Sequence, residues 1–335
     1  MRTPARLTGV RQGPDSEKGA AGILVAVMML VLIGVGAIAV DVGQIYVERG
    51  ELQNAADAGA LAGAQICSET AGCTQADADA VAALLANQNS KDGVSSVGFV
   101  DLSVPFEVTV GTRTLNGANG SGFLTKLFAN ALNTPDIGVG ATATAKWEYP
   151  TRGRSILPLT FAPCEFIDDG LPHKILTQGG GAGAVDCTGL NPSNQTIPGG
   201  FAWLDPDGTT GCQVTAEVGE WSMTSAGAAM PTGCGAIFNS DLVGQTVAIP
   251  VYEYTCKDMF SPCTGSNVQY LIEQWAGFEV MGWKFPGNVH DPDSVFSTSE
   301  KGLYGTFVGY FADPSLFTGG SSTPTGNLKI LGLIK

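Results

Sequence analysis

GAAGILVAVMMLVLIGVGAIAV, residues 19–40, is an unbroken run of apolar or small residues that leads directly into Asp41-Val42-Gly43-Gln44-Ile45-Tyr46. A helix rises about 1.5 Å per residue, so this run reaches about 33 Å, which is enough to cross the hydrocarbon core of a bilayer. The sequence therefore predicts a membrane-spanning helix near the N-terminal end of the chain.

A cleaved signal peptide is the alternative interpretation of this run. Ala37-Ile38-Ala39 is similar to the small-residue triplet at which such peptides are cut. The run is longer than the usual signal-peptide core of about 7–15 residues, and this length favours a retained anchor.

The charges that flank the run predict its orientation. Four positive charges precede it: Arg2, Arg6, Arg11 and Lys18. The first positive charge beyond it is Arg49. The positive-inside rule then places the N-terminus in the cytoplasm and the chain after Asp41 outside, so we expect a single-pass protein of the cell membrane whose bulk is extracytoplasmic.

The overall composition restricts the classes of function. The chain has 17 Lys and Arg against 31 Asp and Glu, a net charge of −14. Such an acidic chain is a poor ligand for nucleic acid, whose binding depends on Lys and Arg. Charged residues make up only 14% of the chain and there are 46 glycines, which is typical of a β-rich secreted protein with many turns.

All eight cysteines follow the apolar run, in the part expected to be outside: Cys67, Cys73, Cys164, Cys187, Cys212, Cys234, Cys256 and Cys263. An even number in an oxidising compartment predicts disulfides, and pairing of sequence neighbours is the simplest of the many possible connectivities. A zinc site is the alternative, but the chain has no C-x-x-C pair and only two histidines. We therefore expect no metal and no other cofactor.

The helical pattern continues beyond the predicted membrane span. No proline occurs between Gln44 and Ala64, and small residues recur there at three- and four-residue steps. This stripe contains Leu52, Ala55, Ala56, Gly59, Ala60 and Gly63. Such a face allows close backbone approach, either to this protein's own outer domain or to a partner subunit, so Leu52, Ala56, Gly59, Ala60 and Gly63 are the helix-packing candidates.

The rest of the chain predicts an α+β fold. A second helix is expected at 75–86, a loop at 87–93, strands at 103–110 and 137–145, and a helix at 123–132 between them. Further strands are expected at 156–161, 201–204, 246–254, 276–285 and 303–311 in an antiparallel architecture. The predicted parts are a cytoplasmic tail (1–18), a transmembrane helix (19–40), a membrane-proximal helical region (41–93), a small α+β unit (94–150) and a β-rich, disulfide-stabilised outer domain (151–335).

The segment LQNAADAGALAGA, residues 52–64, follows the Asp-Val-Gly exit of the apolar run and closely resembles the N-terminal module of TadE/TadG-like Flp pilus-assembly membrane proteins. The residues that carry the resemblance are Asp41, Tyr46, Leu52, Gln53, Asn54 and Asp57. Weaker similarity to the outer domain of bacterial members extends over 199–205, 247–251, 275–280 and 305–310.

The resemblance implies a single-pass component of the Flp, or tight-adherence, apparatus or of a related surface-export system. Its implied partners are the membrane and other proteins of that system, with self-association as a further possibility, and no reaction is implied.

Two departures from related proteins matter. A prepilin-peptidase signature would have a glutamate five residues after Gly19, where this chain has Leu24. The D-x-S-x-S metal motif of von Willebrand type A domains is broken at Pro105 in Asp101-Leu102-Ser103-Val104-Pro105, and we interpret this segment as the start of a strand.

No catalytic constellation is evident. The chain has neither a G-x-S-x-G nor an S-x-x-K motif, and His173 and His290 are expected in solvated turns. Two acidic pairs are the candidates for acid-base chemistry: Asp168 with Asp169, and Asp205 with Asp207. Asp205-Pro206-Asp207-Gly208 is first a turn sequence and only second a calcium-like fragment.

The aromatic residues late in the chain have two interpretations. They are Trp275, Phe278, Trp283, Phe285, Tyr304, Phe307, Tyr310 and Phe311. Packing between two strands is the simpler one, whereas Trp275 with Tyr270 could form an exposed platform for sugar rings. The sequence thus favours a structural role in pilus assembly or surface export, with a cell-surface adhesion or glycan-binding module as the alternative and an extracytoplasmic hydrolase as a third, less favoured one.

Overall fold

The computed structural model describes residues 18–70, 72–89, 95–115, 128, 137–178, 184–192, 194–208, 211–225, 230–255, 268–321 and 326–334. Two compact units are present. Unit 1 is formed by residues up to Gly59 together with 80–100 and 110–143, and unit 2 by 60–79, 101–109 and 144–335. The combination of an N-terminal apolar helix with a disulfide-containing, β-rich part confirms the predicted α+β class.

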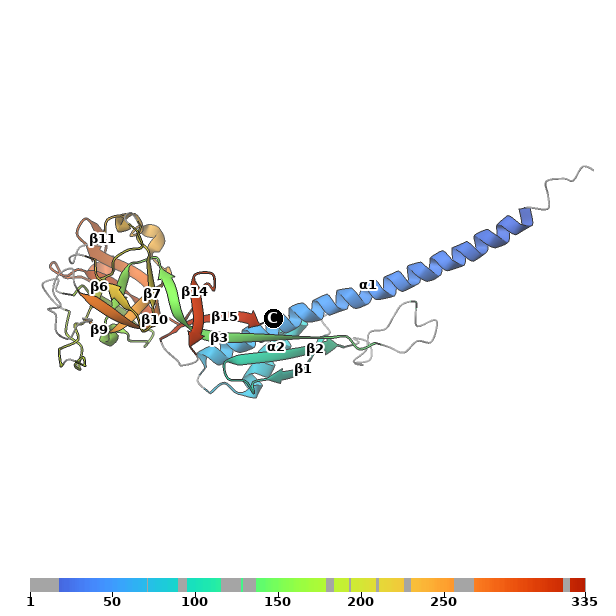
Figure 1. Ribbon diagram of the computed structural model, residues 1–335, viewed down its shortest axis with the longest axis horizontal. Coiled ribbons are helices and arrows are strands. Elements are labelled where there is room, and N and C mark those ends of the chain that lie inside the picture. Colours follow the sequence, from blue (N-terminus) through green and yellow to red (C-terminus); the bar gives the residue numbers. More distant parts are fainter. Residues whose placement is uncertain are drawn as a thin grey trace, which may run out of the picture. The chain divides into compact units, whose positions relative to one another are not determined.

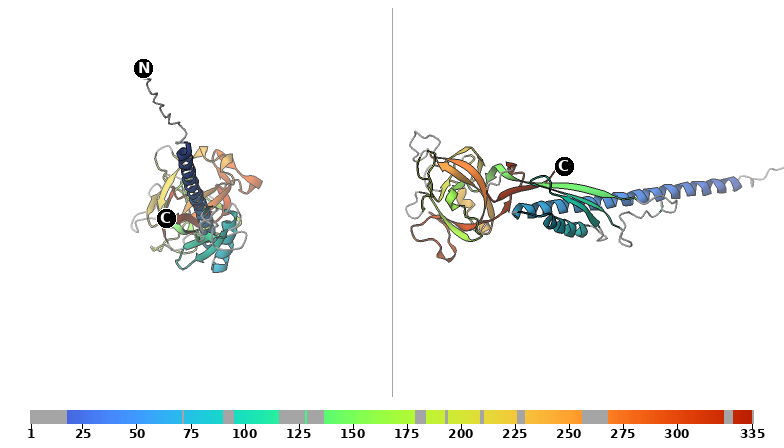
Figure 2. Two further views of the ribbon diagram at one scale, coloured as in Figure 1. Left: turned by 90° about the vertical axis from the view of Figure 1, so that its right-hand side faces the viewer. Right: turned by 90° about the horizontal axis from the view of Figure 1, so that it is seen from below.

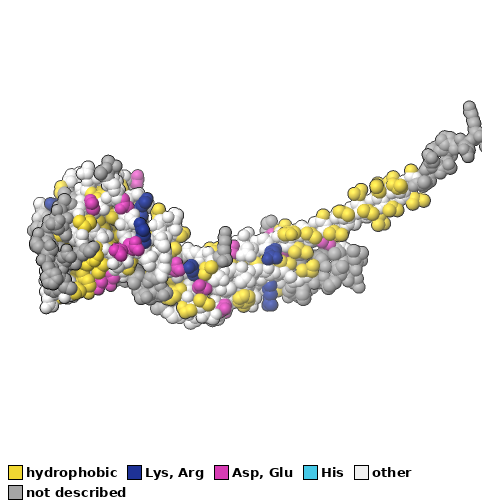
Figure 3. All heavy atoms as spheres, viewed as in Figure 1, with side chains coloured by type: hydrophobic (Ala, Val, Ile, Leu, Met, Phe, Trp, Pro, Cys, Tyr) yellow, Lys and Arg dark blue, Asp and Glu magenta, His cyan; other side chains and the backbone are white. Residues whose placement is uncertain are grey.

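Helix α1, Lys18–Glu69, is one continuous helix of 52 residues (Figure 1). At about 1.5 Å per residue it is about 78 Å long. The side chains of residues 21–40 are almost all exposed, and apolar groups cover this part of the helix (Figure 3). Among the described residues, α1 is the helix that is long and apolar enough to cross a membrane.

A short turn separates α1 from helix α2, Gln75–Gln88. Gly72 has a φ of 78°, a left-handed conformation that glycine adopts without strain, and the disulfide Cys67–Cys73 closes the turn. Thr74 and Asp77 cap the start of α2, because the Asp77 carboxylate accepts from the Thr74 amide at 2.9 Å and from the Thr74 hydroxyl at 2.7 Å. These hydrogen bonds lower the pKa of Asp77.

Unit 1 packs helices against a small sheet. Its strands come from β1 (Ser95–Asp101), β2 (Glu107–Thr114) and the first residues of β3 (Gly140–Ser155), in the order β1-β2-β3. Helix α2 lies alongside α1 (Figure 2). Alternate residues of β2 are buried, including Val110, Thr112 and Thr114, as expected for a sheet with one covered face.

Unit 2 contains an eight-stranded sheet in the order β5-β12-β10-β9-β4-β6, with β8 and β11 also paired to β10. These strands are β4 (Leu159–Phe161), β5 (Pro172–Leu176), β6 (Phe201–Trp203), β8 (Trp221–Met223), β9 (Thr246–Thr255), β10 (Gln269–Phe285), β11 (Asn288–His290) and β12 (Gly302–Phe307). Most of the described pairs are antiparallel, as predicted, while β4 pairs with β9 in parallel.

The remaining strands of unit 2 assemble around the long strand β3. They are β7 (Val214–Glu217), β13 (Tyr310–Phe311), β14 (Phe317–Ser321) and β15 (Leu328–Ile334). Strand β3 pairs antiparallel with β7, β14 and β15, and β13 joins β15 in parallel. Four short 3-10 helices, η2 (Pro163–Glu165), η3 (Cys234–Ala236), η4 (Ser240–Leu242) and η6 (Pro292–Ser294), lie between described strands of this unit.

The core of unit 2 is aromatic. Phe161 is fully buried, and its ring centroid lies 5.1 Å from Phe278 and 5.6 Å from Phe307 in edge-to-face contacts. Trp275 and Trp283, at 0% and 2% exposure, are buried as well. The late aromatic residues therefore include large core side chains, and Trp275 with Tyr270 (4% exposed) does not form the exposed platform that was the alternative.

Three disulfides are formed by the described cysteines: Cys67–Cys73, Cys164–Cys187 and Cys212–Cys234. These are the pairs expected from neighbour pairing. The expected fourth pair, Cys256 with Cys263, lies outside the described residues. Cross-links of this kind stabilise a domain chiefly by restricting its unfolded chain.

Several predicted elements have different ends. The strand expected at 103–110 begins only at Glu107, so the interpretation of Asp101–Pro105 as the start of a strand is wrong. The amide of Ser103 donates to the Asp101 carboxylate at 2.8 Å, and the amide of Glu107 donates to the Val104 carbonyl at 3.2 Å. These bonds make a turn in which the side chain of Asp101 competes with strand pairing.

Long-range pairing explains the other differences. The strand expected at 137–145 is the beginning of β3, which continues to Ser155 because it pairs with β7, β14 and β15. The domain bound predicted at 150 therefore falls inside this strand. The strand expected at 303–311 is divided into β12 and β13, since Tyr310 pairs with Leu328 of β15. The helix expected at 123–132 lies outside the described residues except for Phe128.

Candidate functional site

The candidate site is the part of α1 that follows the apolar run, beginning at Asp41. One side of the helix becomes buried there: Asp41 is 4% exposed, Leu52 is 2%, and Ala55 and Ala56 are 0%. These positions recur at helical spacing, so they lie along one face. The predicted small-residue stripe is therefore a packing face.

In unit 1 this face contacts α2 and β2. A Cβ atom on Gly59 would lie 3.4 Å from both the Ala82 backbone and a Val110 methyl group, so the bare glycine is in close contact with each element. The hydroxyl of Thr112 also donates to the Leu52 carbonyl oxygen at 2.8 Å. A strand hydroxyl thus anchors the sheet to the helix backbone.

In unit 2 the same face continues with Ala60, Gly63 and Ala64, of which both alanines are fully buried. A Cβ atom on Gly63 would lie only 2.9 Å from the Val108 Cγ1 atom, which is closer than real Cβ contacts. The helix-packing candidates Leu52, Ala56, Gly59, Ala60 and Gly63 are thus covered by this chain.

Asp41 is a buried carboxylate at the junction between the apolar run and the packed part of α1. Its oxygens accept a hydrogen bond from the Phe128 amide at 3.0 and 3.3 Å. A buried acid needs such partners to offset its desolvation. The family-motif residue Asp41 is therefore buried and hydrogen-bonded, although it directly follows a segment suited to a bilayer.

Gln53 and Asp57 form a second motif pair. The Gln53 side-chain amide donates to the Asp57 carboxylate at 2.8 Å, one helical turn away, and to the Thr142 carbonyl at 3.4 Å. The pair thereby connects α1 to the first residues of β3. Its role is to hold the helix surface next to the sheet.

The opposite face of the motif helix is uncovered by the described residues. Tyr46 is 74% exposed and Asn54 is also exposed. A Cβ atom on Gly43 or Gly50 would have no neighbour within 4 Å. We call Val42, Gly43, Tyr46, Gly50 and Asn54 the outward face, because they lie on the side of α1 away from Leu52 and Gly59.

The helix, the fold and the candidate site together define a class of protein. In the described part of the chain, one long apolar helix is followed by a folded, β-rich portion that contains disulfides. Residues 19–65 match the family model described as "Putative Flp pilus-assembly TadE/G-like". The chain therefore carries a TadE/G-like Flp pilus-assembly module, which confirms the resemblance seen in its motif. No curated protein and no solved structure matches the chain.

The family match has consequences for role and location. It links the chain in general terms to Flp pilus assembly and to protein partners within a pilus system. The apolar part of α1 accords with membrane anchoring of such a component. The weaker similarity at 199–205, 247–251, 275–280 and 305–310 lies beyond the matched residues.

The histidines and acidic pairs do not assemble into a catalytic group. His173 lies in β5 and His290 in β11, so their placement in turns was wrong; both strands were missed because each is short and contains a polar residue. The His173 ring contacts the Asp169 carboxylate at 2.8 Å. The Asp207 carboxylate accepts from the Thr215 hydroxyl at 2.6 Å, and no group of three or more His, Cys, Asp or Glu suited to a metal occurs within the described part.

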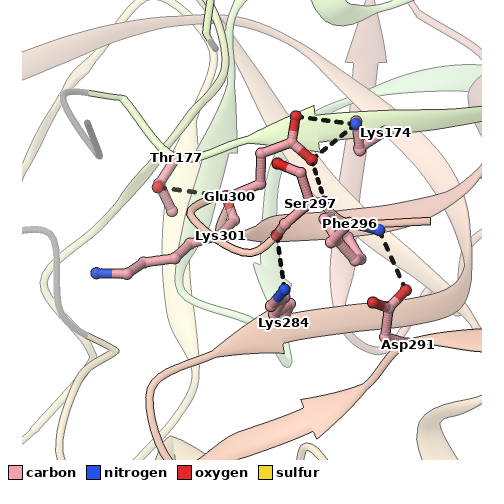
Figure 4. Close-up of polar contacts among 8 residues, drawn as sticks. All are labelled: Lys174, Thr177, Lys284, Asp291, Phe296, Ser297, Glu300 and Lys301. Atoms are coloured by element: carbon pink, nitrogen blue, oxygen red, sulfur yellow. Dashed lines mark hydrogen bonds and ion pairs between the residues drawn. The ribbon is translucent and has the colours of Figure 1, made fainter. Parts of the chain in front are cut away.

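A polar cluster near β12 has a structural role (Figure 4). Lys174 of β5 contacts both oxygens of Glu300 at 2.8 and 3.0 Å, and Glu300 also accepts from the Ser297 amide at 2.7 Å. The hydrogen bond from Lys174 is the main cause of the lowered pKa of Glu300. Lys284 donates to the Ser297 carbonyl at 2.6 Å, so the cluster fixes the segment that leads into β12.

Glu165 is the half-buried acid of unit 2 whose protonation should affect stability. Burial raises its pKa, although the Gly200 amide, which donates to its Oε1 at 2.8 Å, and the nearby His173 act in the opposite direction. The folded protein therefore holds this proton more tightly than the unfolded chain does. Its contribution to stability is complete below the unfolded pKa, near 4.3 for glutamate, and is lost as the pH rises through the folded pKa.

Replacing this acid should remove that pH dependence. We expect Glu165→Gln, which keeps an acceptor for the Gly200 amide, to gain stability relative to the wild type as the pH rises from about 4 to 7. Unfolding temperatures at several pH values measure the difference. The exposed Glu220→Gln is the matched control. Parallel curves for wild type and Glu165→Gln would contradict the assignment.

Proposed function

We propose that the protein is a membrane-anchored assembly component of a Flp (Tad) type pilus or a related surface-export system. The match of residues 19–65 to the TadE/G-like family carries the proposal, because this segment contains both the apolar run and the packed motif helix. The positive charges before the run favour a cytoplasmic N-terminus and an extracytoplasmic location for the remainder.

The outward face of α1 supports a specific partner surface. The buried face is already occupied by α2 and β2, whereas Tyr46 lies exposed between Gly43 and Gly50. A tyrosine supplies a large contact area at low entropic cost, and flanking glycines allow another helix to approach closely. We therefore assign contact with a pilus-system protein to this outward face.

Deletion and cross-linking test the proposal. Loss of the gene should reduce surface filaments or export, as seen by electron microscopy of intact cells. A photo-cross-linking residue at position 46 should capture a protein of the same system, whereas the same residue at the exposed position Leu84 of α2 should not. Normal filaments and export after deletion would exclude the assembly role.

A point variant separates assembly from folding. Gly50→Leu adds bulk where nothing lies within 4 Å, so the protein should fold normally while cross-linking from position 46 falls. Protease digestion of spheroplasts, in which only the cytoplasmic membrane separates inside from outside, tests the orientation, because unit 2 should be cut only if it is extracytoplasmic. Protection of unit 2 in spheroplasts, with cleavage after lysis, would reverse the proposed topology.

A further inference from the structure

Three neighbouring strands of unit 2 bring two arginines to one surface. Strand β3 lies between β7 and β14, with Arg152 opposite Glu217 of β7 and Thr318 of β14. Two residues further on, Arg154 is opposite Thr215 of β7. Residues two apart in a strand point to the same face, so both guanidinium groups belong to one side of this three-stranded segment.

Close packing on the opposite side of β3 shows in which direction the two arginines point. Gly153, between the two arginines, faces the Phe317 ring so closely that a Cβ atom there would lie 2.0 Å from the ring. Phe317 itself is buried and contacts Trp275 at a centroid distance of 5.1 Å. Because Gly153 faces the core, Arg152 and Arg154 must face outward.

The outward side forms a small polar pocket. Its volume is about 240 Å³, and Arg152, Arg154, Thr215, Ser315, Leu316 and Thr318 line it. Ligand pockets for drug-sized molecules are usually about 300–1,000 Å³. This pocket therefore suits a compact ligand, and its side chains are mainly cationic or hydroxyl-bearing.

The charges around the pocket leave the arginines incompletely neutralised. Arg152 lies 3.9 Å from the Glu217 carboxylate, at the outer limit of an ion pair, and within the described part of the chain Arg154 has no ion pair. Two further carboxylates are bonded to residues that line the pocket, and within the described part neither forms an ion pair with Arg152 or Arg154: Asp207 accepts from the Thr215 hydroxyl, and Asp313 accepts from the Ser315 amide at 2.8 Å. Two guanidinium groups thus face one opening in a chain of net charge −14.

We propose that this pocket binds a compact ligand through a carboxylate or phosphate group held between Arg152 and Arg154. Guanidinium groups match such oxyanions with two parallel hydrogen bonds, and Thr318 lines the same opening, whereas the Thr215 hydroxyl donates its proton to Asp207. The proposal does not depend on the assembly role, because it concerns only residues of unit 2.

Calorimetric titration of the detergent-solubilised full chain tests the site with glucuronate, inorganic phosphate and uncharged glucose as probes. We expect glucuronate, phosphate or both to bind, with affinity that falls as salt is added, and glucose not to bind. Binding of glucuronate alone identifies a carboxylate ligand, and binding of phosphate alone identifies a phosphate ligand. Failure of both anions to bind would overturn the proposal.

Charge-matched variants distinguish this pocket from general attraction of anions. Arg152→Gln and Arg154→Gln should each weaken binding by about threefold to fivefold, because each variant removes one exposed positive charge from the pair that holds the anion. Lys301→Gln removes one positive charge elsewhere in unit 2, where its side chain extends away from the polar cluster (Figure 4), and should bind as the wild type does. Equal affinity in all variants, at unchanged unfolding temperature, would exclude the site.

Discussion

Gly59→Leu is expected to disrupt the packing of α1 in unit 1 and to lower its free energy of unfolding by about 1–3 kcal/mol, the usual cost of overpacking a close interface. A Cβ atom at this position already meets the Ala82 backbone and Val110 at 3.4 Å, so the remaining atoms of leucine have no room. The backbone of α2 or the strand β2 must move to accommodate them.

Hydrogen–deuterium exchange of the detergent-solubilised protein measures this effect locally. Amides of residues 44–59 and 110–114 should exchange faster in the variant. The control is Gly50→Leu in the same helix, where a side chain meets nothing within 4 Å. It should leave exchange unchanged or slow it, because leucine is a better helix former than glycine by up to about 1 kcal/mol. Equal exchange in both variants would mean that Gly59 does not contact α2 and β2.

The packing face around Gly59 shows which features of the candidate site could be predicted from the sequence. The spacing of small residues from Leu52 to Gly63 indicated a packing face, because a 3.6-residue period is a local property of the chain. It left open what covers that face, since the covering residues, Ala82, Val108 and Val110, come from distant segments. The alternation of Val108, Val110 and Thr112 in β2 was the signal that could have identified them.

The fold of unit 2 was predictable to the extent that its strands are locally apolar. The strands at 201–204 and 246–254 were expected almost as found, because they are continuous buried runs. Strand β3 was not, since its second half, around Arg152 and Arg154, is polar on one side and is held by pairing with β7 and β14. For the same reason the Arg-Gly-Arg sequence gave no sign of a pocket before its neighbours were known.

Phe161→Ala is expected to lower the free energy of unfolding of unit 2 by about 3–5 kcal/mol, the typical cost of deleting a buried phenylalanine ring. Phe161 is fully buried, and its ring contacts Phe278, Phe307 and Phe201 at centroid distances of 5.1, 5.6 and 6.5 Å. Removal leaves a cavity at the contact between β4 and the β10–β12 pair, which those rigid rings can fill only in part.

Urea unfolding followed by tryptophan fluorescence reports on this core, because Trp203 and Trp283 belong to the same buried cluster as Phe161. The control is Leu171→Ala, which shortens a side chain that is 61% exposed in the same unit and should change stability by no more than about 0.5 kcal/mol. If Phe161→Ala were as stable as the control, Phe161 and its aromatic neighbours would not form the core. The alternative interpretation, in which aromatic residues bind a ligand, would then have to be considered again. A loss of several kcal/mol would leave the surface pocket at Arg152 and Arg154 as a candidate ligand site among the described residues of unit 2.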